Sequence, residues 1–163
     1  ILCNDDELAS RARRVTTTSR VPHPYEFTHD EIAFNYRMPN LNAAVGCGQM
    51  QRLPGYLEKK RRLAARYAEV FSSIDGIDHV SEPPECVSNY WINILLLAPG
   101  YEKSRVSFFE AANAAGIGAR AAWVPISDLP MYADCPKMDM SVTQDLYNRI
   151  INVPSSPHLV GDD

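Results

Sequence analysis

Apolar spacing and capping residues predict five helices along the chain. The first, from about Asp5 to Arg14, is preceded by Asn4 and contains Glu7 three positions later, which is the spacing of a capping box. A long amphipathic helix is expected to end at Gly76, because glycine readily adopts the backbone conformation that closes a helix. The expected helices cover residues 5–14, 41–53, 57–74, 106–115 and 141–150.

Short apolar runs predict the strands. These runs cover residues 77–80, 90–98, 117–124 and 151–153, and residues 1–3 have the character of a strand end whose sheet partners lie outside the sequence. From residue 77 onward the expected order is strand, strand, helix, strand, helix, strand. Such an order packs as a small α/β layer, so we expect the α/β fold class. We place a domain boundary near Gly76, which separates residues 1–76 from residues 77–163.

Two stretches show neither a helical nor a strand period. The first, Thr16–Met38, contains His23 and His29 among prolines and aromatic residues, and the second is Pro125–Met140. Loops longer than about 15 residues inside a compact chain are usually functional or disordered. The aromatic content of Thr16–Met38 favours an ordered loop on which something packs.

The expected helix at 41–53 contains Gly46 and Gly48, and Pro54-Gly55 is expected to end it. A glycine inside a helix costs about 1 kcal/mol relative to alanine, so the close approach of another backbone would compensate. An ordinary buried helix and a subunit contact both satisfy this pattern.

Charge and composition exclude several classes of partner. The sequence has 16 Lys and Arg against 20 Asp and Glu, a net charge of −4, which offers no excess cation for a nucleic-acid backbone. The longest strongly apolar run, Ile94–Ala98, is far shorter than the ~20 residues of a membrane helix. The four cysteines are widely spaced and form no C-x-x-C pair, so we expect reduced thiols rather than disulfides or zinc ligands. We therefore expect a cytoplasmic protein without a nucleic-acid or membrane partner.

Common catalytic motifs are absent from the sequence. It contains no Gly-rich phosphate loop, no H-E-x-x-H and no G-x-S-x-G. Histidines 23 and 29, within the expected ordered loop, are better candidates for a functional role than His79 and His158. None of the four lysines has the apolar surroundings that would lower its pKa toward nucleophilic use. The basic run Glu58–Arg62 is expected to be a solvated helix face.

The most informative stretch is Phe-Asn-Tyr-Arg-Met-Pro-Asn-Leu-Asn-Ala-Ala at residues 34–44. It resembles the signature of the DegT/DnrJ/EryC1/StrS family of sugar-nucleotide aminotransferases, and further similar stretches follow in family order, so the resemblance covers essentially the whole chain. These further stretches lie at residues 1–20, 89–91, 113–117, 129–132 and 150–156. Residues 17–25 look closest to members that aminate sugars for legionaminic acid or related surface polysaccharides.

The resemblance implies the C-terminal part of a fold-type-I pyridoxal-phosphate enzyme that is dimeric, with each active site built from both subunits. Residues 1–76 would be a remnant of the large domain with its active-site loop and interdomain helices. Residues 77–163 would be the small C-terminal α/β subdomain, with a short, mainly antiparallel sheet. In the family, the lysine that carries pyridoxal phosphate lies upstream of the strand that opens this chain. The resemblance therefore assigns no catalytic residue and no metal ligand here, and we expect the chain alone not to bind the cofactor.

The family also implies roles for individual residues. Asn35 matches the asparagine that reaches across the dimer to the cofactor phosphate, and Tyr36 and Arg37 match neighbours that line the substrate side. Arg120 matches an arginine whose guanidinium could receive a carboxylate or phosphate. Arg37 and Arg120 could instead be structural partners of acidic residues. Ser127 stands where close relatives of this kind have a histidine.

Three functions remain open at this stage. We expect a piece of a sugar-nucleotide aminotransferase that is inactive alone. The alternatives are a half-enzyme completed by a chain that carries the missing large-domain segment, and a non-catalytic dimerisation or binding module. In each case we expect a homo-oligomer, most simply a dimer, with residues 43–48 in an interface.

Overall fold

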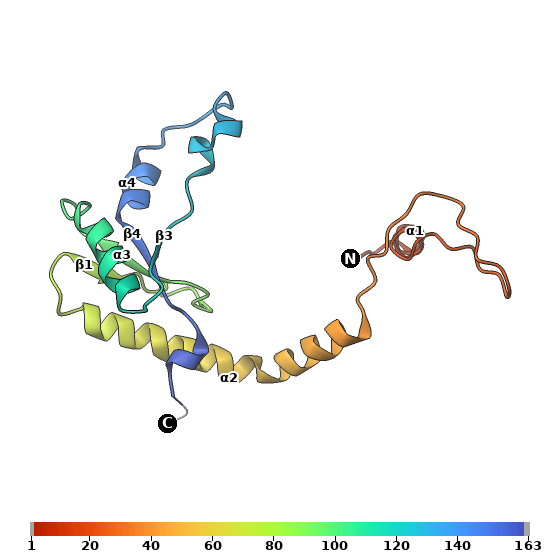
Figure 1. Cartoon of the computed structure of the whole chain (residues 1–163), viewed down its shortest axis with the longest axis horizontal. Coiled ribbons are helices and arrows are strands. Elements are labelled where there is room, and N and C mark those ends of the chain that lie inside the picture. Colours follow the sequence, from red (N-terminus) through yellow and green to blue (C-terminus); the bar gives the residue numbers. More distant parts are fainter. Residues whose placement is uncertain (1, 162–163) are drawn as a thin grey trace. The chain divides into compact units, whose positions relative to one another are not determined.

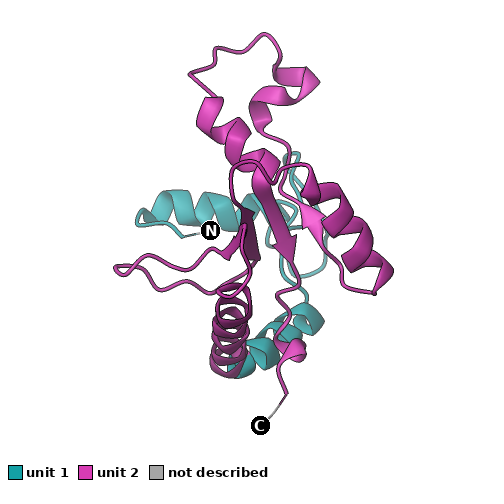
Figure 2. Ribbon diagram, turned by 90° about the vertical axis from the view of Figure 1, so that its left-hand side faces the viewer, with its two compact units in different colours: residues 1–52 teal, residues 53–163 magenta. Residues whose placement is uncertain are grey.

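A computed structural model describes residues 2–161 of the chain (Figure 1). Contacts divide the chain into two compact units, residues 1–52 (unit 1) and residues 53–163 (unit 2), which Figure 2 distinguishes by colour. This division does not coincide with the domain boundary expected at Gly76, which stays a prediction. The helices are α1 (Asp6–Val15), α2 (Asn40–Phe71), α3 (Ser104–Ala114) and α4 (Ser141–Arg149), and the strands are β1 (Ile77–His79), β2 (Asn93–Leu97), β3 (Arg120–Ala121) and β4 (Ile150–Val153).

Helix α1 forms where the capping pattern predicted it, one residue later than expected. The N-cap is Asp5 rather than Asn4, and its side chain accepts a hydrogen bond from the Leu8 amide at 2.7 Å. Arginines in the last turn, Arg13 and Arg14, complement the helix dipole.

Helix α2 contradicts the predicted break, because it continues through Pro54 as one helix. A proline inside a helix removes one amide donor, here the donor to the Met50 carbonyl. Pro54 and Gly55 are both exposed and Met50 is 66% exposed, so water can hydrate that carbonyl. The boundary between the two units falls beside this proline, after Arg52.

The four strands form one antiparallel sheet in the order β1-β2-β4-β3. This confirms the expected small antiparallel sheet of an α/β subdomain. Strand β2 begins at Asn93 instead of residue 90, because the Tyr90 and Trp91 amides donate to the Ser88 and Asn89 side chains and cannot join the ladder. The predicted strand at 117–124 is likewise reduced to β3.

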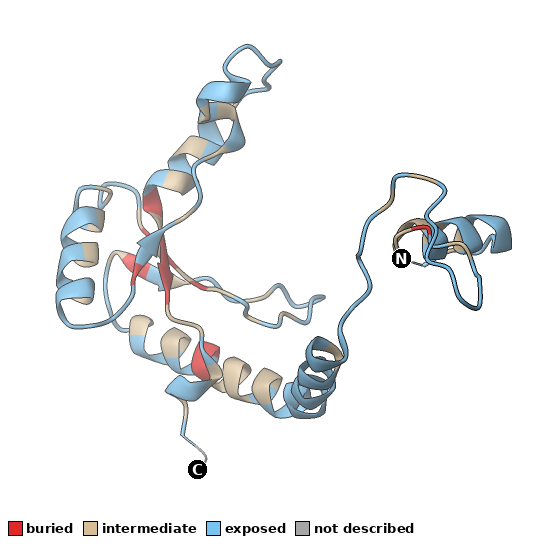
Figure 3. Ribbon diagram, turned by 45° about the vertical axis from the view of Figure 1, so that its right-hand side comes forward, coloured by how far each residue is buried: buried red, intermediate tan, exposed pale blue. Residues whose placement is uncertain are grey.

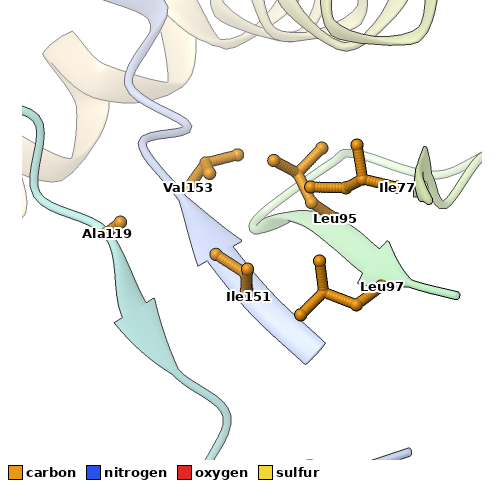
Figure 4. Packing of buried hydrophobic residues seen from close by; sticks show 6 residues of the cluster. All are labelled: Ile77, Leu95, Leu97, Ala119, Ile151 and Val153. Carbon is orange, nitrogen blue, oxygen red and sulfur yellow. The ribbon is translucent and has the colours of Figure 1, made fainter. Parts of the chain in front are cut away.

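Alternate positions of the strands build the apolar core. Leu95 and Ile151 are fully buried and face each other across β2 and β4 in the register of the sheet. Tyr67 and Phe71 of α2 and aromatic residues of α3 pack against this layer. The core side chains, shown in Figure 4, are Ile77, Leu95, Leu97, Ala119, Ile151 and Val153.

Burial differs sharply between the two units (Figure 3). All buried apolar residues of the described chain lie in unit 2, whereas in unit 1 Ser19 is the one buried residue between positions 2 and 52. Unit 1 therefore has no apolar core of its own. Across residues 2–161, no helix combines the length and the apolar character needed to cross a membrane.

Candidate functional site

The stretch predicted as a long ordered loop folds back on itself in unit 1. Antiparallel bridges join Thr17 to Asn35 and Arg20 to His29. The Phe34 amide donates at 2.9 Å to the carbonyl of Val15, the last residue of α1. The backbone around Asn35 is therefore fixed to the end of α1 by hydrogen bonds.

Ion pairs hold the outer part of this loop to α1. Arg11 pairs with Glu31, and Arg14 pairs with Asp30 and lies 3.4 Å from Glu31. The hydrogen bond from Arg11 lowers the pKa of Glu31, and the hydrogen bond from Arg14 lowers the pKa of Asp30. Buried Ser19 donates to Glu31 at 3.0 Å, which connects the ion pairs to the inner turn of the loop.

The structure brings Asn35, Tyr36 and Arg37 together on one exposed segment. The Tyr36 amide donates to the Thr16 carbonyl at 2.9 Å, and its ring stacks on Phe34 with centroids 5.3 Å apart. The side chains of Asn35 and Arg37 are exposed. Among residues 2–161, no carboxylate pairs with Arg37, so the structural ion pair considered as an alternative does not form there.

The two loop histidines have structural roles. The His23 ring accepts hydrogen bonds from the Tyr25 and Glu26 amides at 3.3 and 3.0 Å, and His29 Nδ1 lies 2.7 Å from the Thr18 carbonyl. Within the described part of the chain, no group of three or more His, Cys, Asp or Glu side chains could hold a metal ion.

The fourth predicted residue, Arg120, lies in unit 2 on β3 and is exposed. It borders a pocket of about 430 Å³ that is also lined by Lys60 of α2 and by residues at and just beyond the end of β4. No acidic side chain of the described residues pairs with it. Ser127 lies outside this pocket, in the 3-10 turn η1 (Ile126–Asp128), and donates to Asp128 at 3.1 Å.

Lys60 is the functional candidate that the sequence analysis missed. Its ammonium lies in the same pocket and donates to the Ser155 carbonyl at 2.6 Å. Burial lowers the pKa of Lys60. The expectation that no lysine lies in surroundings that lower its pKa is therefore wrong.

The prediction of a solvated face at Glu58–Arg62 is wrong for the same reason. Arg61 pairs with Glu82 and donates to the Ser88 carbonyl at 2.6 Å, so residues 82–88 cover this part of α2. The hydrogen bond from Arg61 and the Ser88 amide lower the pKa of Glu82. Helical spacing showed which residues share a face, but the segment that covers this face is about 20 residues away in sequence.

Solved structures of aminotransferases have the same fold as this chain over part of their length. The solved structure of Helicobacter pylori PseC, an aminotransferase involved in the biosynthesis of pseudoaminic acid, matches with a TM-score of 0.80 and 18% identity. That match covers 96% of this chain and 43% of PseC. An aminotransferase of the DegT/DnrJ/EryC1/StrS type from Brucella abortus matches with a TM-score of 0.73 and 23% identity, over 99% and 42% of the two chains.

Sequence relatives are longer proteins. EpsN of Bacillus subtilis, named as a pyridoxal phosphate-dependent aminotransferase, is 29% identical over all of this chain and 42% of its own length. GDP-perosamine synthase of Vibrio cholerae is 28% identical over 99% of this chain and 44% of its own length. The chain thus spans less than half the length of these relatives. The profile of the DegT/DnrJ/EryC1/StrS aminotransferase family matches residues 1–163, and the chain belongs to that family.

Proposed function

We propose that this chain acts as the C-terminal part of a pyridoxal-phosphate-dependent sugar-nucleotide aminotransferase and completes the active site of a second subunit. The observation that carries the proposal is the exposed Asn35–Arg37 segment, whose backbone is fixed by hydrogen bonds. Among the described residues, no acidic side chain forms an ion pair with Arg37. Family membership and sugar-nucleotide aminotransferases among the relatives support it.

The residues present fit the phosphate of the cofactor. The neutral side-chain amide of Asn35, on a backbone fixed in advance, is a suitable donor to this phosphate, and the guanidinium of Arg37 beside it suits an anionic part of the substrate. In this proposal Asn35 holds the phosphate, while Tyr36, Arg37 and Arg120 orient the substrate. When bound, pyridoxal phosphate supplies the carbonyl carbon that takes up and passes on an amino group.

Exposed apolar residues of α2 in unit 1 support assembly into a dimer. Leu41, Val45 and Met50 are 74%, 58% and 66% exposed, and nothing lies within 4 Å of a side chain built at Gly46 or Gly48. Since unit 1 also has no apolar core, a second copy or a large-domain segment would bury these residues. Light scattering should show a chain that self-associates, and a strictly monomeric chain at high concentration would contradict the proposal.

Reconstitution tests the proposed activity. The large-domain segment of Vibrio cholerae GDP-perosamine synthase, fused to or mixed with this chain, should restore the synthesis of GDP-perosamine. The chain alone, incubated with pyridoxal phosphate and borohydride, should give no stoichiometric adduct at a unique lysine. An adduct that maps to one lysine, above all to Lys60 with its lowered pKa, would overturn the assignment of the cofactor lysine to the other segment.

A further inference from the structure

The connection between β1 and β2 is tied to α2 through the side chain of Glu82. The Glu82 carboxylate accepts from both terminal nitrogens of Arg61, one of them at 3.1 Å, and from the Ser88 amide. Arg61 also donates to the Ser88 carbonyl at 2.6 Å. The Glu82 side chain is only 20% exposed, so water competes little for these contacts. Glu82 and Arg61 together therefore hold both backbone groups of Ser88.

Tyr90, two residues further on, has a strained backbone. Its φ of 45° lies in the left-handed region, which a bulky side chain rarely adopts. Its hydroxyl accepts from the Glu82 amide at 3.2 Å, and its own amide donates to the Ser88 hydroxyl at 3.0 Å. The guanidinium carbon of Arg61 lies 5.7 Å from the centre of its ring. Such a conformation persists only where its surroundings enforce it, so Glu82 and its partners set the direction in which the chain leaves Tyr90.

Trp91 follows this turn directly and contacts a second indole. Its ring stacks on Trp123 with centroids 6.0 Å apart and planes inclined by 27°. The guanidinium carbon of Arg120 lies 5.4 Å from the centre of the Trp123 ring. Among the described residues no carboxylate pairs with Arg120. The ring of Trp123, supported by Trp91, is therefore the described contact that orients this guanidinium.

We propose that Glu82 is a positioning residue that orients Arg120 for the substrate. It fixes the turn at Tyr90, and this turn holds Trp91 against Trp123. Glu82 does not line the pocket that Arg120 borders, so its effect passes through the two indoles. A guanidinium oriented in advance loses less conformational freedom when it meets an anionic group. This assignment rests on the proposed function, which gives Arg120 its substrate role, and it adds a residue outside the site.

The stacking of the two indoles can be measured directly, because Trp91 and Trp123 are the two tryptophans of the chain. Stacked indoles couple electronically and give a pair of opposite bands in far-ultraviolet circular dichroism. We expect this couplet in the parent chain, and Trp91→Phe should abolish it and define the baseline. A parent chain without the couplet would overturn the proposal.

Glu82→Gln tests whether Glu82 maintains this stacking. A glutamine amide offers one acceptor oxygen where three donors converge, so the couplet should fall toward the baseline. Glu85→Gln removes the same charge at an exposed position of the same connection and should retain the couplet of the parent. Ile77→Val, a core substitution, controls for stability measured by urea unfolding. An unchanged couplet in Glu82→Gln, or an equal loss in Ile77→Val, would overturn the proposal.

Kinetics of the reconstituted enzyme test whether Glu82 acts through Arg120. Glu82→Gln should raise the KM for the sugar nucleotide about 2- to 30-fold, the range expected for coupling through packed side chains, and should leave kcat nearly unchanged. Glu85→Gln should leave both constants unchanged. In the Arg120→Gln background, Glu82→Gln should raise KM no further, because the group that it orients is gone. Fully additive effects of the two substitutions would overturn the proposal.

The two sets of measurements distinguish this inference from the proposed function. If amino transfer is restored and the effects on KM are additive, the positioning role is wrong and the proposed function stands. If Glu82→Gln weakens the couplet but no reconstituted enzyme transfers an amino group, the proposed function is wrong and the hold of Glu82 on the indole pair stands.

Discussion

In unit 1, polar contacts hold the chain between Thr16 and Met38, whereas in unit 2 buried aliphatic side chains hold the sheet. The loop of unit 1 depends on ion pairs and backbone hydrogen bonds to α1, and it exposes its aromatic residues. The sheet of unit 2 buries Leu95 and Ile151 completely. Polar contacts fix the loop without covering apolar surface, so the aromatic side chains of unit 1 stay exposed, whereas the buried core of unit 2 stabilises the chain.

The largest effect should come from the core of unit 2. Leu95→Ala removes a fully buried side chain and should lower the free energy of unfolding by about 2 to 5 kcal/mol. Leu41→Ala, at a position 74% exposed in unit 1, should change it by less than about 0.5 kcal/mol in the chain alone. Urea unfolding followed by circular dichroism measures both values. Equal destabilisation by the two substitutions would show that unit 1 buries a core of its own.

A smaller effect should come from the one buried residue of unit 1 among those described. Ser19→Ala removes the hydroxyl that donates to Glu31 and should destabilise the loop by about 1 kcal/mol. Ser10→Ala, at an exposed position of α1, is the matched control. Amide hydrogen exchange at Thr18 and Tyr36, which donate to Phe34 and Thr16, should become faster in Ser19→Ala and stay the same in Ser10→Ala.

The pH dependence of the loop gives a further test. Hydrogen bonds from Arg11 and Arg14 lower the pKa values of Glu31 and Asp30 in the folded chain. A lowered carboxylate pKa contributes stability that is complete above its ordinary value, about 4.3 for glutamate, and is lost as the pH falls through the lowered pKa. The protection of the Tyr36 amide, taken relative to its intrinsic exchange rate at each pH, should therefore fall in acid before the protection of the β2 amides does.

Glu31→Gln separates this effect from general acid unfolding. The variant should exchange faster at neutral pH and show a weaker dependence on acid at Tyr36, because one of the two titrating carboxylates is gone and Asp30 remains. Glu26→Gln, at an exposed position outside the ion pairs, is the control and should behave like the parent chain. The same pH profile in the parent chain and in Glu31→Gln would show that the ion pairs of Glu31 do not hold the loop.

Much of the fold could be predicted from local patterns. The capping residues located α1 to within one residue, and the apolar runs at 77–80 and 151–153 match β1 and β4 closely. The continuity of α2 through Pro54 could not be predicted, because the exposure that allows the helix to tolerate a proline belongs to the folded chain.

The candidate site was predictable only in part. The family resemblance pointed to Asn35, Tyr36, Arg37 and Arg120, and their roles remain predictions. Lys60 was missed because burial of one lysine in a basic run depends on Ser155, which is 95 residues away in sequence. The rings of Trp91 and Trp123 stack on each other, which no sequence periodicity predicts. The two residues come together only because β2 and β3 lie on either side of β4 in one sheet.

The central claim is that unit 1 completes the active site of a second subunit through Asn35. In the reconstituted enzyme, Asn35→Ala should remove one hydrogen bond to a charged phosphate, worth about 1.5 to 3 kcal/mol, and weaken cofactor binding about 10- to 150-fold. Asn42→Ala, another exposed asparagine in the same unit, is the matched control and should leave cofactor affinity unchanged. Titration of pyridoxal phosphate into both variants gives the answer directly, and unchanged affinity in Asn35→Ala would contradict the account.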